Sequence, residues 1–178
     1  MKLWKRTVLL MLVTLLCALI PVGTLSLYIT GKRSLNNAAE TYGRQLENGK
    51  ILLEQFWDNS KYEQMSETGK KSYLEFQFLR CCGEKMLLIN SESKEAIVDL
   101  TDYGIVSRDN LVLNKKTDSY EYKVQKLNHE FLLLVHSLLT NTEGYEILSV
   151  RDVTSMFTEL RQTAVWFLEI YLAVFCIA

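Results

Sequence analysis

The two ends of the chain are apolar, and this constrains the fold more than any other feature. Residues 7–30 (TVLLMLVTLLCALIPVGTLSLYIT) contain no charged side chain, and residues 163–178 (TAVWFLEIYLAVFCIA) contain one, Glu169. A helix that crosses a membrane needs about 20 mostly apolar residues, because the hydrocarbon core is about 30 Å thick and a helix rises about 1.5 Å per residue. The first segment is long enough for a crossing. We interpret the second as a second membrane helix in truncated form.

This interpretation divides the chain into four parts: residues 1–6 as a cytoplasmic N-terminus, 7–30 as transmembrane helix 1, 31–162 as an extracytoplasmic domain and 163–178 as transmembrane helix 2. Basic residues before the first segment place the N-terminus in the cytoplasm by the positive-inside rule, although Lys32 and Arg33 on the other side weaken that signal. A cleaved signal peptide is the alternative. It is disfavoured because the apolar run exceeds the usual ~7–15-residue signal core and no A-x-A-like site follows it.

The central part carries mixed charge and no catalytic motif. It has no long run of either sign, which excludes the clustered basic face that binds nucleic acid. Cys81 and Cys82 are adjacent and lack the C-x₂-C spacing of zinc sites, so we interpret them as thiols whose redox state the sequence leaves open. No glycine-rich nucleotide loop, catalytic triad or metal-ligand cluster is found. The sequence therefore predicts no catalytic residue, no metal and no cofactor.

Two seven-residue repeats predict long helices on either side of this domain. The first repeat consists of Leu35, Ala39, Tyr42, Leu46, Gly49, Leu53 and Phe56. The second consists of Val153, Phe157, Leu160, Ala164, Phe167, Tyr171 and Val174, and it runs into the second apolar segment without a break. Such a repeat lines one side of a helix, and it suits packing on another helix or on the domain's own sheet. The continuous second repeat favours a helical bundle in a homodimer.

Between the repeats the period changes to two, which predicts strands. A hairpin is expected over Met86–Asn90 and 95–100, and further strands over 120–125, 130–139 and 145–151. The segment 130–139 (EFLLLVHSLL) is apolar on both faces, which is typical of an interior strand. Residues 70–80 are expected to form a short helix, and 101–116 a mixed loop. The predicted class is α+β, with a mainly antiparallel sheet of about five strands.

Two segments carry a resemblance to a known family. The hairpin MLLINSESKEAIVD (86–99) and the exit YEILSVRDVTSMFTELR (145–161) resemble the extracytoplasmic PAS-like or Cache-like sensor domains of bacterial sensor histidine kinases. The resemblance implies that the chain is the signal-sensing and transmembrane-transducing portion of a two-component kinase in the bacterial cell membrane. Its cognate response regulator would be engaged through a cytoplasmic catalytic half that is absent from these residues.

The family's phosphorylated histidine is not present. His129-Glu130-Phe131 begins like the motif H-E-[FL]-[RK]-[TN]-P, but it continues into Leu132-Leu133-Leu134 without a basic residue or a proline. Two alternatives therefore stay open. The same input design serves chemoreceptors and cyclic-dinucleotide enzymes, and a membrane-anchored binding or accessory protein would have no enzymatic output. The stimulus, the output domain and the oligomeric state are not defined by the sequence.

Candidate binding residues lie around the mixed loop. The resemblance implies a loop that closes over a pocket, and Tyr103, Arg108, Tyr120 and Tyr122 would suit a small anion or an amino acid there. Alternatively, the tyrosines are core and rim residues of the sheet. His136 is expected to be a hydrogen-bonded core histidine, with ligand contact or pH sensing as alternatives.

Glu169 is the candidate intramembrane residue. A charge at the centre of a membrane helix costs about 2.5–3.5 kcal/mol on insertion scales, so such a residue usually has a partner or a role in signalling or assembly. It lies about six residues into its segment. Reaching back to the membrane interface is therefore the competing explanation.

Overall fold

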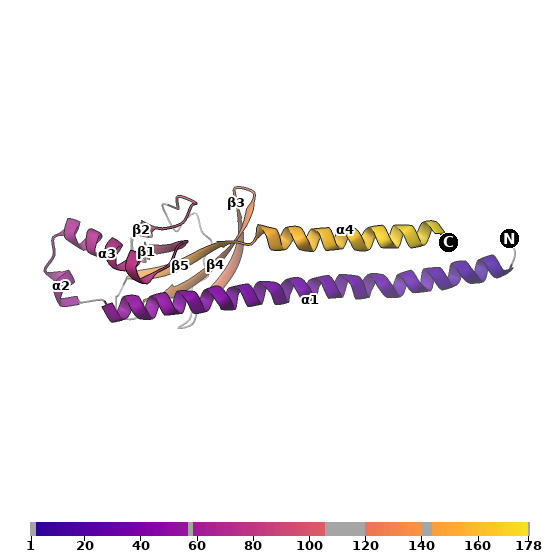
Figure 1. The fold of residues 1–178 in the computed structure, drawn as a ribbon, viewed down its shortest axis with the longest axis horizontal. Helices are drawn as coiled ribbons and strands as arrows, with labels where there is room; N and C mark the ends of the chain where they lie inside the picture. Colours follow the sequence, from indigo (N-terminus) through magenta and orange to yellow (C-terminus); the bar gives the residue numbers. More distant parts are fainter. Residues whose placement is uncertain (1–2, 57–58, 106–119, 140–143, 178) are drawn as a thin grey trace. The chain divides into compact units, whose positions relative to one another are not determined.

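The computed structural model describes residues 3–56, 59–105, 120–139 and 144–177 (Figure 1). The helices are α1 (Leu3–Phe56), α2 (Asn59–Glu63), α3 (Glu67–Cys81) and α4 (Thr154–Ile177). The strands are β1 (Met86–Asn90), β2 (Ala96–Asp99), β3 (Glu121–Leu127), β4 (Glu130–Leu138) and β5 (Tyr145–Asp152). This arrangement confirms the α+β class, the long N-terminal helix and the five-stranded sheet.

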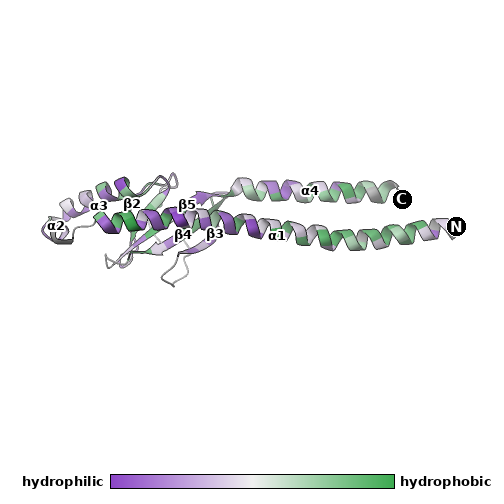
Figure 2. Cartoon of the chain, turned by 60° about the horizontal axis from the view of Figure 1, so that its bottom comes forward, coloured by the Kyte–Doolittle hydropathy of each residue, from purple (hydrophilic) through white to green (hydrophobic). Residues whose placement is uncertain are grey.

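The chain forms two compact units. One consists of Met1–Asn37 with Thr154–Ala178, and the other is Ala38–Val153. Helix α1 contributes to both, because its N-terminal part belongs to the first unit and its C-terminal part to the second. Figure 2 shows the corresponding change along α1, from mainly apolar near the N-terminus to mixed polar and apolar in the second unit.

The sheet of the second unit has the strand order β2-β1-β5-β4-β3, and every neighbouring pair is antiparallel. As predicted, β4 is an interior strand, and its residues Leu132–Ser137 are all buried. Successive residues of a strand point to opposite faces, so the register assigns each side chain to one face.

We call the two faces of the sheet the loop face and the helix face. The loop face carries Leu87, Leu134 and Leu148, which form a buried cluster with Ile105 from the segment after β2. The helix face carries the alternate residues, including the fully buried Leu133 and Ile147. Each face therefore has its own apolar layer, and the sheet is covered on both sides.

The C-terminal part of α1 packs on the helix face. Arg151 of β5 places its guanidinium 5.1 Å from the ring centroid of Tyr42 and contacts the Gln45 side chain at 3.4 Å. The repeat positions Leu46 and Leu53 are 0% and 1% exposed. The first seven-residue repeat is thus covered by the domain's own sheet, as one of the two sequence alternatives proposed, and its buried residues are not available for a helical dimer.

Gly43 is required where α1 crosses the edge of the sheet. A methyl group on its Cα would lie 2.7 Å from two ring carbons of Tyr120. We expect Gly43→Ala to destabilise the protein by about 1–3 kcal/mol, the usual cost of overpacking, measured by urea denaturation. Gly83→Ala is the matched control, because a methyl group there meets nothing within 4 Å. Equal stability of the two variants would contradict this contact. Adding Tyr120→Ala to the Gly43→Ala variant should relieve the overpacking and restore part of its stability.

In the first unit, α4 packs against the N-terminal part of α1. The Tyr171 hydroxyl donates a 2.8 Å hydrogen bond to the Leu19 carbonyl, and a methyl group at Gly23 would lie 2.6 Å from that hydroxyl oxygen. Further along, a methyl group at Gly31 would lie 3.0 Å from Leu160. The contacts pair later residues of α4 with earlier residues of α1, so the two helices are antiparallel. The second seven-residue repeat therefore also faces a partner within the same chain.

Helix α1 is long and apolar enough to span a membrane, judged by length and composition. No other helix in the part of the chain that the structure describes meets the same test. The predicted second span is therefore not supported by the described helix.

Candidate functional site

The structure describes three of the four residues predicted to bind a ligand, and these three are not brought together. Tyr103 packs against the apolar cluster of the loop face. Tyr122 pairs with Val135 and so points to the helix face, where Tyr120 packs on Gly43. Arg108 lies outside the described residues. The three described tyrosines are thus divided between the two faces of the sheet and do not line one site.

Asp99 fixes the segment that covers the loop face. One of its carboxylate oxygens accepts hydrogen bonds from the backbone N–H of Thr101 at 2.7 Å and from the Thr101 hydroxyl. The other accepts from the backbone N–H of Ile105 at 2.7 Å. An aspartate at the end of a strand commonly holds a turn in this way. The turn carries Tyr103 and Ile105 back over the sheet.

Tyr103 lies in an acidic part of the loop face. Desolvation, a hydrogen bond to Glu130 and the nearby carboxylates of Asp152 and Asp102 raise its pKa to about 12. The phenol is therefore neutral at physiological pH and donates to Glu130. An anionic ligand would be repelled by these three carboxylates.

A second polar group lies on the same face, where β4 and β5 carry His136 and Glu146. The His136 Nε2 atom is 3.1 Å from the Glu146 Oε2 atom, and the two side chains are only 9% and 5% exposed. The prediction of a hydrogen-bonded core histidine is confirmed. Glu146 was not identified from the sequence, although its even spacing from the apolar Leu148 and Val150 places it on the inward face.

Glu121 of β3 completes this group. It lies directly opposite His136 in the β3–β4 pair. Its Oε2 atom is buried and, among the residues described, has no hydrogen-bond partner. A buried carboxylate oxygen without a donor is costly, so this position is suited to a donor from outside the described residues. We call Glu121, His136 and Glu146 the loop-face triad.

The charges around this triad favour a positively charged or hydrogen-bond-donating group. The described loop-face carboxylates are those of Asp99, Asp102, Glu121, Glu130, Glu146 and Asp152, and the one lysine at a loop-face register position is Lys123. No group of three His, Cys, Asp or Glu side chains within the described ranges has a geometry that could hold a metal ion. An ammonium or guanidinium group is therefore a better match than an anion.

The two central cysteines are structural thiols. Both are free, and Cys82 is 6% exposed with its Sγ atom near Gly49 of α1. Burial, with a smaller contribution from Cys81, raises the pKa of Cys82 to about 12. Burial also raises the pKa of Cys81, against the lowering effect of Arg80. Neither thiol has the depressed pKa of a reactive cysteine.

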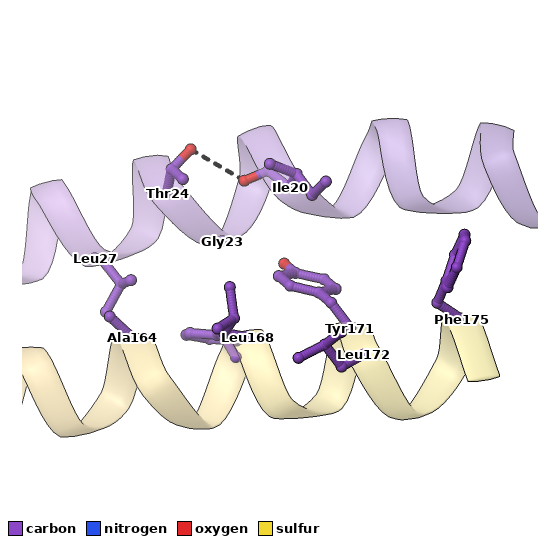
Figure 3. A pocket seen from close by; sticks show the side chains of 10 residues that line it. Ile20, Gly23, Thr24, Leu27, Ala164, Leu168, Tyr171, Leu172 and Phe175 are labelled. Carbon is purple, nitrogen blue, oxygen red and sulfur yellow. Dashed lines mark hydrogen bonds between the residues drawn. The ribbon is translucent and has the colours of Figure 1, made fainter.

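The first unit contains an apolar groove of about 440 Å³ between α1 and α4 (Figure 3). It is lined by Ile20, Gly23, Thr24, Leu27, Ala164, Phe167, Leu168, Tyr171, Leu172 and Phe175. In Figure 3 the Tyr171 ring reaches from α4 toward α1 beside Gly23. Glu169 does not line this groove and is exposed.

Comparisons with known proteins add no identification: no protein-family model matches the chain, and no curated protein matches it significantly.

Proposed function

We propose that this chain is the input region of a bacterial membrane sensor histidine kinase, with two transmembrane helices and a PAS-like or Cache-like extracytoplasmic domain between them. The observation that carries the proposal is the antiparallel pair formed by α4 and the apolar part of α1, with the Tyr171–Leu19 hydrogen bond and close contacts at Gly23 and Gly31. Small residues and interhelical hydrogen bonds are typical of helix contacts in membranes. This helix pair supports the proposal that α4 also crosses the membrane. The crossing would then extend past the apolar residues that the structure describes.

The fold supports a sensor role for the domain. A covalently continuous path leads from the loop-face triad to the membrane pair, because Glu146 lies on β5, which ends at Asp152, and α4 begins at Thr154. A ligand that binds the triad would act on the strand that leads directly into α4. We propose a small ligand with an ammonium or guanidinium group as the stimulus. Of the two ligand classes expected from Tyr103 and Arg108, an amino acid carries such a group and a simple anion does not. A homodimer and a cognate response regulator belong to the same proposal.

The kinase assignment is tested by sequencing the gene past codon 178. We expect the reading frame to continue through a basic membrane exit into a helix with the motif H-E-x-[RK]-[TN]-P. A frame that continues into a methyl-accepting or cyclic-dinucleotide module would replace the kinase with one of those outputs. A stop codon within a few residues would overturn the transducing role altogether.

The topology is tested with the native cysteine Cys81, which is partly exposed in the central domain. In intact spheroplasts at pH 8.5, a membrane-impermeant maleimide should label Cys81. The alkaline pH is needed because burial raises the pKa of this thiol and the thiolate is the reactive form. Cys81→Ser is the control and should lose the label. Labelling that requires cell lysis would place the domain in the cytoplasm and contradict the proposal.

A further inference from the structure

Helix α4 carries another set of residues at seven-residue spacing, on the side away from α1. Ser155, Glu159, Gln162, Trp166, Glu169, Ala173 and Cys176 follow one another at alternating intervals of four and three residues. All seven side chains are exposed. We call this set the outer stripe. It is mainly polar and small, unlike the apolar repeat that faces α1.

The outer stripe lies opposite the contact with α1. Each residue of an α-helix turns by about 100°, so Glu169 is about 200° from Phe167 and from Tyr171. Phe167 and Tyr171 line the groove toward α1. The partner helix within the chain therefore covers one side of α4 and leaves the outer stripe uncovered.

Glu169 is the residue of this stripe that requires a partner. It lies within the apolar part of α4, about 9 Å along the axis from Thr163. No hydrogen bond or ion pair joins Glu169 to another described residue. An ionisable side chain inside a membrane generally pairs with another polar group or faces the interior of a bundle. Neither is provided by α1, which lies on the other side.

We propose that the outer stripe is the contact between the α4 helices of two copies of the chain in the membrane, an inference that rests on the proposed second crossing. Two copies with the same topology have parallel α4 helices, and a two-fold axis between them places each residue beside its equivalent. Each Glu169 side chain then faces the Glu169 of the second copy, which provides the polar partner that such a residue generally has inside a membrane. Gln162, seven residues earlier, likewise faces its equivalent and can both donate and accept hydrogen bonds.

The small residues of the stripe fit the same partner. Ala173 and Cys176 lie one and two turns beyond Glu169, and small side chains let two membrane helices approach closely. The proposed contact between two copies is thus separate from both apolar repeats, whose residues pack against other parts of the same chain. A side of the helix that faces only lipid has no requirement for polar and small residues at seven-residue intervals.

Cys176 makes the contact directly measurable. In membranes containing the chain with Cys17→Ser and Cys81→Ser, molecular iodine should link Cys176 of two copies. Two thiols lose two protons and two electrons to form the S–S bond, and iodine is reduced to two iodide ions. We expect a disulfide-linked dimer on a non-reducing gel, lost in the Cys176→Ser variant. The matched control combines Cys176→Ser with Phe175→Cys. Position 175 lines the groove toward α1, so a cysteine there should give only background dimer.

Glu169 variants distinguish pairing from snorkelling. Glu169→Leu should lower the yield of the Cys176 dimer by about threefold or more, in keeping with the strength of interhelical hydrogen bonds in membranes, whereas Glu169→Gln should retain most of it. If Glu169 only reaches back to the interface, Glu169→Leu will leave the yield unchanged, and that outcome overturns its role in the contact.

A maleimide-linked polyethylene glycol separates this inference from the proposed crossing. We expect Cys176 in intact membranes to be modified only after detergent is added. Modification without detergent would show that α4 does not cross, and would overturn the crossing and the contact together. A shielded Cys176 that forms no dimer with iodine would overturn the contact alone.

Discussion

Replacing Leu46 with alanine is expected to lower the free energy of unfolding by about 2–5 kcal/mol, as for other fully buried leucines. Leu46 is 0% exposed in the middle of the first seven-residue repeat, where α1 packs on the helix face of the sheet. Truncation removes apolar contacts and leaves a cavity that rigid neighbours on the sheet fill only partly. Urea denaturation of the detergent-solubilised chain, followed by circular dichroism, measures the loss.

The control is Leu52→Ala on the same helix. Leu52 is 41% exposed, so its truncation should cost less than about 1 kcal/mol. The denaturation midpoint of Leu46→Ala should not vary over a tenfold range of protein concentration, because the contact is within one chain. A midpoint that rises with concentration in the native chain and not in Leu46→Ala would show that the repeat joins two copies, and would contradict the packing described.

The periodicity of the sequence predicts the elements better than their partners. The hairpin pattern of 86–100 and the alternation in 120–125 correctly predict strands of an antiparallel sheet, and the continuous apolar run 130–139 correctly predicts the buried interior strand. The seven-residue repeats correctly predict long helices. They do not distinguish a sheet from a second helix as the partner, because both require one continuous apolar side of the helix. Leu46 and Tyr171 find their partners within the chain.

The candidate site was less predictable for a related reason. Tyr103 follows a strand, so no alternation fixes the face on which it lies. That face is set by the hydrogen bonds that the Asp99 carboxylate accepts from the backbone N–H groups of Thr101 and Ile105. Tyr122 does lie in an alternating segment, but its face depends on the register with β4. Register is a tertiary property, and a shift by one residue would exchange the two faces.

The loop-face triad could not be predicted from the sequence for the same reason, because it also depends on the register of the strands. Glu121 and Glu146 are separated by 25 positions and belong to strands on either side of β4. Each looks like an ordinary polar residue of a strand until both pairings place it beside His136. The inward spacing of Glu146 relative to Leu148 and Val150 was the one available signal, and it indicated burial without identifying the partner.

Replacing His136 with leucine is expected to destabilise the chain by about 1–3 kcal/mol, the cost of leaving a buried carboxylate without its hydrogen-bond partner. The imidazole is 9% exposed and lies 3.1 Å from the Glu146 carboxylate, which would stay buried. Urea denaturation measures the effect. The control is His129→Asn, because His129 is exposed with a φ of 72°, a left-handed conformation that asparagine tolerates, so the change should be within about 0.5 kcal/mol. A loss below about 1 kcal/mol for His136→Leu would contradict a coupled pair.

The double variant His136→Leu with Glu146→Leu shows why the pair is present. Replacing a buried pair by apolar residues of similar size is often neutral or stabilising, so the double variant should regain most of the stability that His136→Leu loses. If it does, the pair is not needed to hold the sheet together. Its burial on the loop face, beside a Glu121 oxygen without a described donor, is then explained by binding rather than by stability. A double variant as unstable as the single one would instead make the triad part of the structural core, and the proposed stimulus site would have to lie elsewhere on the domain.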